Sequence, residues 1–301
     1  MNMKVDLCGV TLNNPVMTAS GTFGSGAEYA EFVDLNKLGA VVTKGVANVP
    51  WPGNPTPRVA EVYGGMLNAV GLQNPGIDLF VERDIPFLKQ FDTKIMVNVC
   101  GHSTEEYIEV VERLRDQPVD LLEINISCPN VKEGGIAFGQ DPKAVEAITK
   151  EMKKHAAQPV IMKLSPNVTD ITEMARAAEA GGADGLSLIN TITGMKIDIN
   201  RQKFVLANKT GGMSGPAIHP VAVRMVYQTA QAVRLPIVGM GGIMNAEDAI
   251  EMILAEASAV SVGTANFTNP HVTEEIVAGI RDYMERYQVA DIKDLVGAVH
   301  E

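Results

Sequence analysis

The sequence predicts an α/β protein, a TIM (β/α)8 barrel that forms a single domain over residues 1–301. Eight short apolar runs recur along the chain, with helical stretches between them. The runs are continuously hydrophobic, which is typical of parallel strands buried on both faces. Eight strand–helix units also fit the usual length of one such barrel. The runs are 15–20, 40–44, 95–99, 121–127, 159–165, 184–190, 236–242 and 259–264.

The segments around these runs supply the other elements. The N-terminal stretch 4–15 alternates and turns, which predicts a hairpin that closes the bottom of the barrel. Asp141 precedes Pro142 as a helix N-cap precedes a proline at the first helical position, and Asn245 is a second predicted N-cap. Glycines near the end of 169–183 predict a helix C-terminus. The clearest helices are expected at 103–117, 141–155, 169–183 and 245–257.

Insertions are predicted after strands two, four and six. Residues 45–92 follow the second run and include the proline-rich VPWPGNPTPR, and residues 191–219 follow the sixth. A glycine-containing loop, 129–139, follows the fourth. All three should emerge at the C-terminal face of the barrel, where long loops usually build a substrate site or a partner surface.

Composition excludes several classes of function. The formal net charge of −11 argues against a nucleic-acid surface, which needs a basic stripe. No run reaches the ~18 apolar residues of a membrane span, and the first residues lack the apolar segment of a signal peptide. Three cysteines without a C-x-x-C do not indicate a disulfide framework or an iron–sulfur site. A cytoplasmic, reduced protein is expected.

Polar residues and glycines gather where the runs end. In a (β/α)8 barrel these positions lie at the mouth and are typical of catalytic or ligand-binding residues. Random polar groups in a core would cost a few kcal/mol each unless paired, so a ring of them at one end indicates a site. The ring comprises Ser20, Thr43, Lys44, Asn98, Asn125, Lys163, Asn190, Thr191, Gly241, Gly242, Gly263 and Thr264.

Lys44 and Lys163 are the two cations of this ring. Either lysine alone could simply extend from a strand end to water. Together they indicate an anionic ligand. A Schiff-base lysine is the rival interpretation, because a desolvated lysine can become a nucleophile. That chemistry needs an acid–base partner, and no carboxylate is expected at the adjacent strand ends, which weakens the rival.

Glycines after the last two strands favour a phosphate site. GMGG (239–242) ends the seventh run and VGT (262–264) ends the eighth. Loops at these positions often bind phosphate through backbone N–H groups and a helix N-terminus. Tight strand–helix turns would explain either motif alone. No G-x-G-x-x-G follows the first strand, so a Rossmann nucleotide site is not indicated.

Cys128 follows the fourth strand, within NISCPN. A free cysteine is most often a small buried filler. Here it precedes a glycine-containing loop on the mouth side, where its thiolate could act as a base or nucleophile. An unperturbed thiol has a pKa of ~8.5, so proton abstraction would improve as pH rises. The five histidines are dispersed without metal-ligand spacing, and no metal is predicted.

These motifs resemble the dihydroorotate dehydrogenases from about Val5 to Thr268. The matching segments are NPVMTASGTFG, VVTKGV, MLNAVGLQNPG, NISCPN, KLSPN, INTITG, GGMSGPA, GMGGI and VGTA. The resemblance implies a TIM barrel that holds FMN at its mouth and oxidises (S)-dihydroorotate to orotate in de novo pyrimidine (UMP) biosynthesis. Cysteine at position 128 resembles class 1, because the membrane-bound class 2 has serine there.

The resemblance is nearest to subclass 1B. It implies a homodimeric core that passes electrons to NAD⁺ through a second subunit carrying FAD and a [2Fe–2S] cluster, together a heterotetramer. The fumarate-linked subclass 1A is the alternative.

The same resemblance implies residue roles. Cys128 would remove the C5 proton of dihydroorotate while hydride passes from C6 to flavin N5. Lys163 would sit by the flavin N1/C2 carbonyl, where negative charge develops. Residues 129–139 would form a lid that excludes water. The implied substrate residues are Lys44, Asn68, Ala69, Val70, Gly71, Leu72, Asn125, Asn190 and Thr191. The implied FMN residues are Ser20, Thr43, Lys44, Asn98, Asn125, Lys163, Ile189, Gly215, Gly241, Gly242, Gly263 and Thr264.

Overall fold

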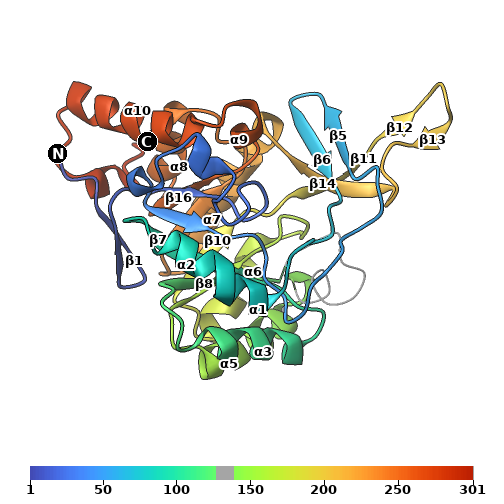
Figure 1. The fold of residues 1–301 in the computed structure, drawn as a ribbon. Coiled ribbons are helices and arrows are strands. Elements are labelled where there is room, and N and C mark those ends of the chain that lie inside the picture. Colours follow the sequence, from blue (N-terminus) through green and yellow to red (C-terminus); the bar gives the residue numbers. More distant parts are fainter. Residues whose placement is uncertain (127–138, 301) are drawn as a thin grey trace.

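The fold is seen in a computed structural model that describes residues 1–126 and 139–300. Within this part of the chain, eight parallel strands close into a barrel surrounded by helices, as predicted (Figure 1). Strands that follow one another among the eight are neighbours in space, and β16 pairs with β3 to close the ring. The barrel strands are β3 Val16–Thr18, β4 Ala40–Val42, β7 Lys94–Val99, β8 Leu121–Asn125, β9 Val160–Lys163, β10 Gly185–Leu188, β15 Ile237–Met240 and β16 Ala259–Val262.

The helices begin at the expected capping residues. Asp141 accepts a hydrogen bond from the Lys143 N–H, and Asn245 accepts one from the Asp248 N–H. Gly181 forms the C-cap of the helix Ile171–Ala180. The glycines near the end of 169–183 predicted this helix C-terminus. The helices are α1 Ile77–Leu79, α2 Ile85–Leu88, α3 Thr104–Leu114, α5 Pro142–His155, α6 Ile171–Ala180, α7 His219–Ala232, α8 Ala246–Leu254, α9 Ala265–Thr268 and α10 Val272–Arg286, with a π-helical segment at Phe80–Asp84 and 3-10 helices at Tyr29–Glu31, Leu35–Lys37, Pro216–Ile218 and Ile292–Leu295.

The N-terminal hairpin forms as predicted and lies against the start of a barrel strand. Strands β1 (Val5–Leu7) and β2 (Val10–Leu12) are antiparallel. At its turn, the Cys8 thiol donates to the carbonyl of Asp184, which immediately precedes β10. The hairpin therefore covers the amino-terminal end of the barrel, opposite the predicted mouth.

The insertions after strands two and six meet in a second sheet. It contains β5 (Val59–Val62) and β6 (Gly65–Asn68) from one insertion and β11 (Ile192–Met195) and β14 (Thr210–Ser214) from the other. Figure 1 shows this sheet and the hairpin of β12 (Ile197–Asp198) and β13 (Lys203–Phe204) on the opposite side from both termini. The insertion after strand four falls mostly outside the described residues.

Candidate active site

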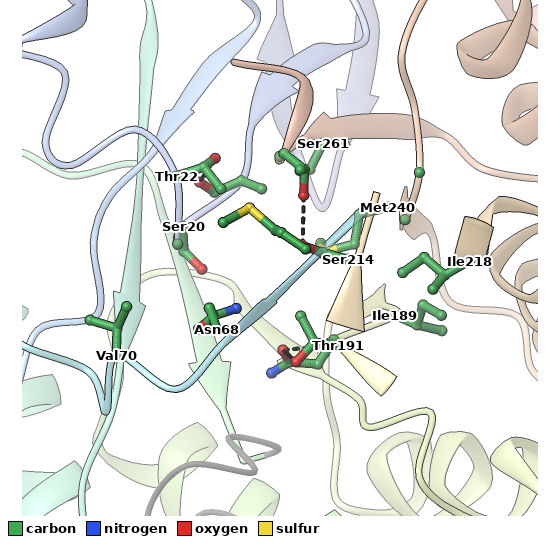
Figure 2. A pocket seen from close by; sticks show the side chains of 18 of the residues that line it. Ser20, Thr22, Asn68, Val70, Ile189, Thr191, Ser214, Ile218, Met240 and Ser261 are labelled. Carbon is green, nitrogen blue, oxygen red and sulfur yellow. Dashed lines mark hydrogen bonds between the residues drawn. The ribbon is translucent and has the colours of Figure 1, made fainter. Parts of the chain in front are cut away.

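A cavity of about 1190 Å³, including its open mouth, lies at the carboxyl ends of the barrel strands. Its lining includes the last residue of β9, residues that follow β3, β4 and β10, and others from β6 and β14 of the second sheet. Figure 2 shows Ser20, Asn68 and Thr191 around this common space, each from a different part of the chain. The two insertions therefore complete a site that the barrel begins.

The structure brings most of the sequence-predicted site residues together. Thr43, Ala69 and Asn98 are fully buried behind the lining, and Gly215 packs against one of the lining glycines. Cys128 and residues 129–138 lie outside the described residues. The predicted residues that line the cavity are Ser20, Lys44, Asn68, Val70, Gly71, Leu72, Asn125, Lys163, Ile189, Asn190, Thr191, Gly241, Gly242, Gly263 and Thr264.

Lys163 is a buried cation with a buried carboxylate beside it. Its Nζ lies 3.2 Å from Ser20 Oγ and 3.6 Å from Glu123 Oε2. The expectation that no carboxylate lies near the strand-end lysines was therefore wrong. Glu123 stands two residues before Asn125 on β8, so both side chains lie on the same face of the strand. That spacing was the signal in the sequence, and the continuous apolar appearance of the run concealed it.

Both oxygens of Glu123 accept hydrogen bonds inside the barrel. Asn98 Nδ2 donates to Oε2 at 2.6 Å, and Ser187 Oγ donates to Oε1 at 2.8 Å. Because Lys163 supplies a counter-charge, the carboxylate is both paired and hydrogen-bonded, as a buried charge requires. Glu123 thus holds Asn98, Lys163 and Ser187 from three neighbouring barrel strands.

Side-chain amides continue from Asn98 to the cavity. Asn125 Nδ2 donates to Asn98 Oδ1 at 3.4 Å, and Asn190 Nδ2 donates to Asn125 Oδ1 at 3.3 Å. Asn190 Oδ1 accepts from the backbone N–H of Thr191 at 2.8 Å. Amides can donate and accept along one planar edge, which suits recognition of a heterocycle with both kinds of group.

Gly241 and Gly242 form a tight turn after β15, with φ angles of +129° and +70°. A Cβ on Gly242 would approach the Cβ of His219 to 2.7 Å and the carbonyl oxygen of Gly215 to 2.8 Å. His219 Nδ1 donates to the Gly241 carbonyl at 2.8 Å. Only glycine fits this turn, and the backbone is left open to the cavity, as a phosphate cradle requires.

Asn74 organises the insertion that supplies the 68–72 segment. Its Oδ1 accepts from the N–H groups of Ala47 and Gly76, while its Nδ2 donates to the Leu72 carbonyl at 2.7 Å. Leu72 has a left-handed φ of +53°, which is uncommon for a residue with a Cβ. Asn74 therefore holds this backbone and ties it to the segment that follows Lys44.

The lining offers the kinds of group that would hold a flavin. Met66, Ile218 and Met240 offer apolar surface for a flat ring, and backbone at the strand-end glycines is accessible for a phosphate. The hydroxyl of Ser261 also belongs to the lining and has no hydrogen-bond partner among the described residues. Lys163 supplies a fixed cation. The residues that sequence reasoning missed here include Met66, Ser214, Ile218, Met240 and Ser261, since neither methionine nor strand-interior serine carries a distinctive motif.

A metal-type cluster lies behind the glycine turn. One ligand atom each from His219, Asp248 and Glu251 falls within 4.8 Å of the others, a grouping that sequence spacing did not suggest. These residues already contact one another, with His219 Nε2 at 3.1 Å from Glu251 Oε2.

Across the described residues, no helix combines the length and apolar character needed to cross a bilayer.

The fold and cavity define a barrel enzyme that binds its ligands at the carboxyl ends of the strands. A family model described as dihydroorotate dehydrogenase matches residues 2–284. A relative from Lachnoclostridium phytofermentans named dihydroorotate dehydrogenase B (NAD(+)), catalytic subunit, is 71% identical over 99% of this chain and 100% of its own. One of the same name from Alkaliphilus metalliredigens is 65% identical over 99% of both chains.

A crystal structure of dihydroorotate dehydrogenase from Eimeria tenella in complex with ferulenol has a TM-score of 0.81 at 22% identity. The match covers 98% of this chain and 88% of the Eimeria tenella chain, and the likeness confirms the fold. The chain belongs to the dihydroorotate dehydrogenase family. Membership implies a flavin-dependent oxidoreductase, and the name "catalytic subunit" implies that these relatives work with another subunit.

Proposed function

We propose that this chain oxidises (S)-dihydroorotate to orotate in de novo pyrimidine biosynthesis, as the FMN-binding catalytic subunit of an NAD⁺-linked enzyme. The observation that carries the proposal is the buried Lys163 beside Asn125 and Asn190 in one cavity. Lys163 and Asn125 are register partners on β9 and β8, so their side chains lie on the same side of the sheet. A cation and amides in this arrangement suit an electron-accepting ring beside a planar, anionic substrate.

The reaction removes one proton and one hydride from adjacent carbons. Cys128 removes the proton from C5, and the electron pair forms the C5–C6 double bond as hydride leaves C6. FMN, when bound, supplies the acceptor for that hydride. Lys163 would stabilise the negative charge that develops at the flavin N1/C2 carbonyl when the flavin is reduced. The phosphate would be held by Gly241, Gly242, Gly263 and Thr264, and the ring would be contacted by Ser20, Thr43, Lys44, Asn98, Ile189 and Gly215.

The substrate would lie among amides and a second cation. Asn125, Asn190 and Thr191 form one hydrogen-bonded row, and the 68–72 segment, whose Leu72 carbonyl accepts from Asn74, lines the same cavity. Lys44, which is only partly buried, is suited to the substrate carboxylate. In this proposal the substrate contacts are Lys44, Asn68, Ala69, Val70, Gly71, Leu72, Asn125, Asn190 and Thr191.

The identity of the relatives favours NAD⁺ over fumarate as the acceptor, and a dehydrogenase over the Schiff-base lyase. We place the enzyme in the cytoplasm, as a homodimeric core with a second subunit that carries FAD and a [2Fe–2S] cluster. The test is to purify the chain alone and together with the proposed second subunit. The chain alone should carry FMN, and NAD⁺-dependent turnover should require the second subunit. Turnover with fumarate by the chain alone would support subclass 1A instead.

A further inference from the structure

We propose that Glu123 is a positioning residue that sets the donor and acceptor directions of Asn98, Asn125 and Asn190, and thereby of the amide groups presented to the substrate. This inference rests on the proposed function, because it concerns how the same site recognises its ligand. Glu123 does not line the cavity and is 1% exposed, so it acts only through the residues that it contacts.

The chemistry of a carboxylate gives the first direction. An ionised carboxylate only accepts hydrogen bonds, and the Lys163 ammonium is its counter-charge at 3.6 Å. Asn98 lies 2.6 Å from Glu123 Oε2 and must therefore turn its NH₂ group toward it. An asparagine can usually be turned either way without a change in shape. Here the carboxylate leaves one choice, and Asn98 Oδ1 faces away from Glu123.

The next two amides follow from the first. Because Asn98 presents its oxygen, Asn125 must donate through Nδ2, at 3.4 Å, and so presents its own Oδ1 to Asn190. Asn190 then donates through Nδ2 at 3.3 Å. We call this hydrogen-bonded series, from Glu123 through Asn98 and Asn125 to Asn190, the amide relay.

The far end of the amide relay is anchored independently. Asn190 Oδ1 accepts from the backbone N–H of Thr191 at 2.8 Å, and a backbone N–H can only donate. The relay thus runs between a group that only accepts, Glu123, and a group that only donates, at Thr191. Each hydrogen bond between these two groups has the donor and the acceptor that both ends require. Reversal of one amide would place oxygen against oxygen or NH₂ against NH₂.

The consequence is selection of one class of ligand edge. Asn125 and Asn190 both line the cavity, so the relay decides which of their atoms a ligand meets. A planar cyclic imide with donors and acceptors in fixed order, such as orotate, matches only one order. A site built to hydrogen-bond a ligand discriminates strongly, because a mismatch leaves buried polar groups unpaired.

The test replaces Glu123 by leucine, which is of similar size but has no hydrogen-bonding group, so nothing at position 123 directs Asn98. Orotate binding is followed by calorimetry and by the absorbance change of the bound flavin. Glu123→Leu should weaken orotate binding about tenfold, the cost of a mispaired buried hydrogen bond. Ser187→Ala is the matched control, since it removes the contact to the other carboxylate oxygen and leaves Asn98 directed. It should bind orotate within about twofold of the unaltered chain.

A double variant tests direction rather than charge. In Glu123→Leu with Asn98→Asp, the carboxylate moves one place along the relay, where it can only accept from Asn125 and so directs that amide as before. Binding should recover most of the loss. Binding of orotate by Glu123→Leu at the strength of the unaltered chain would overturn the proposal, and so would a double variant no better than the single one.

A neutron crystal structure of the unaltered chain keeps the proposal testable if the variants fail to fold. Deuterium should be found on Asn98 between it and Glu123, on Asn125 toward Asn98, and on Asn190 toward Asn125. The opposite arrangement at Asn98 would overturn the inference. An unaltered, flavin-loaded chain that does not bind orotate would contradict the proposed function, and the neutron structure would still decide the direction of the relay.

Discussion

Lys163 and Glu123 form a buried ion pair, with Nζ and Oε2 3.6 Å apart and side chains only 6% and 1% exposed. One partner stands at the end of β9 beside the cavity, and the other lies deeper in the barrel. This pair joins the stability of the barrel to the chemistry of the site. Removal of one charge should therefore change both the stability of the fold and the rate of the reaction.

Lys163→Met should lower the free energy of unfolding by about 3–5 kcal/mol, because it leaves the Glu123 carboxylate buried without its counter-charge. The reduction of bound flavin by dihydroorotate should slow by about 10²-fold or more through loss of the cation. Denaturant unfolding and stopped-flow absorbance measure the two effects. Lys154→Met is the control, since that side chain is 69% exposed and its pair with Glu151 spans 3.7 Å. It should change neither quantity appreciably.

Gly242→Ala should weaken FMN retention about tenfold or more. A Cβ there meets backbone of Gly215 and the side chain of His219, at a left-handed φ of +70°. Gly9→Ala is matched in backbone strain, with φ +83°, but its Cβ would meet nothing within 4 Å. The ratio of flavin to protein after gel filtration compares the two variants. Equal retention in both would show that the glycine turn does not hold the cofactor.

Asn74→Ala should raise the KM for dihydroorotate more than it lowers kcat. It leaves the N–H groups of Ala47 and Gly76 without their side-chain acceptor and releases the Leu72 carbonyl. Steady-state kinetics separate the two parameters. Asn48→Ala, on the same insertion, loses only an exposed contact to Glu109 and should behave as the unaltered chain. An unchanged KM in Asn74→Ala would mean that the 68–72 segment is positioned by other contacts.

The pH dependence of stability should report on Cys8. Burial first, and then the nearby charges of Asp184 and Asp6, raise the pKa of this thiol from 9.0 to about 12. Between these values the unfolded chain has lost a proton that the folded chain keeps, so stability must fall as pH rises from 9 toward 12. Cys8→Ala should flatten that decline in chemical denaturation curves. A parallel decline in both proteins would refute the assignment.

Cys128→Ala should keep FMN but reduce the rate of flavin reduction by dihydroorotate about 10²–10⁴-fold, the usual contribution of a general base. In the unaltered chain the rate should rise with pH, because a rise in pH favours the thiolate that acts as the base. Cys8→Ala is the control, because that thiol stays protonated over the same range. Full reduction rates in Cys128→Ala would remove the cysteine from its proposed role.

Much of the barrel could be predicted because its strands are continuous apolar runs, a pattern typical of buried parallel strands. The runs at 159–165 and 259–264 contain β9 and β16, and the polar residues at their ends line the cavity. The sheet of β5, β6, β11 and β14 was not predicted, since pairing of two distant insertions leaves no local pattern. Glu123 was missed for a related reason, because its partners come from other strands. The single domain and the residue roles stay predictions.

The proposed function requires that this cavity holds FMN and that dihydroorotate reduces it. Anaerobic titration of the purified chain with (S)-dihydroorotate, with orotate quantified in parallel, tests it most directly. The flavin absorbance should be bleached, and about one orotate should form for each FMN reduced. A colourless protein, or a bound flavin that stays oxidised in excess dihydroorotate, would contradict it.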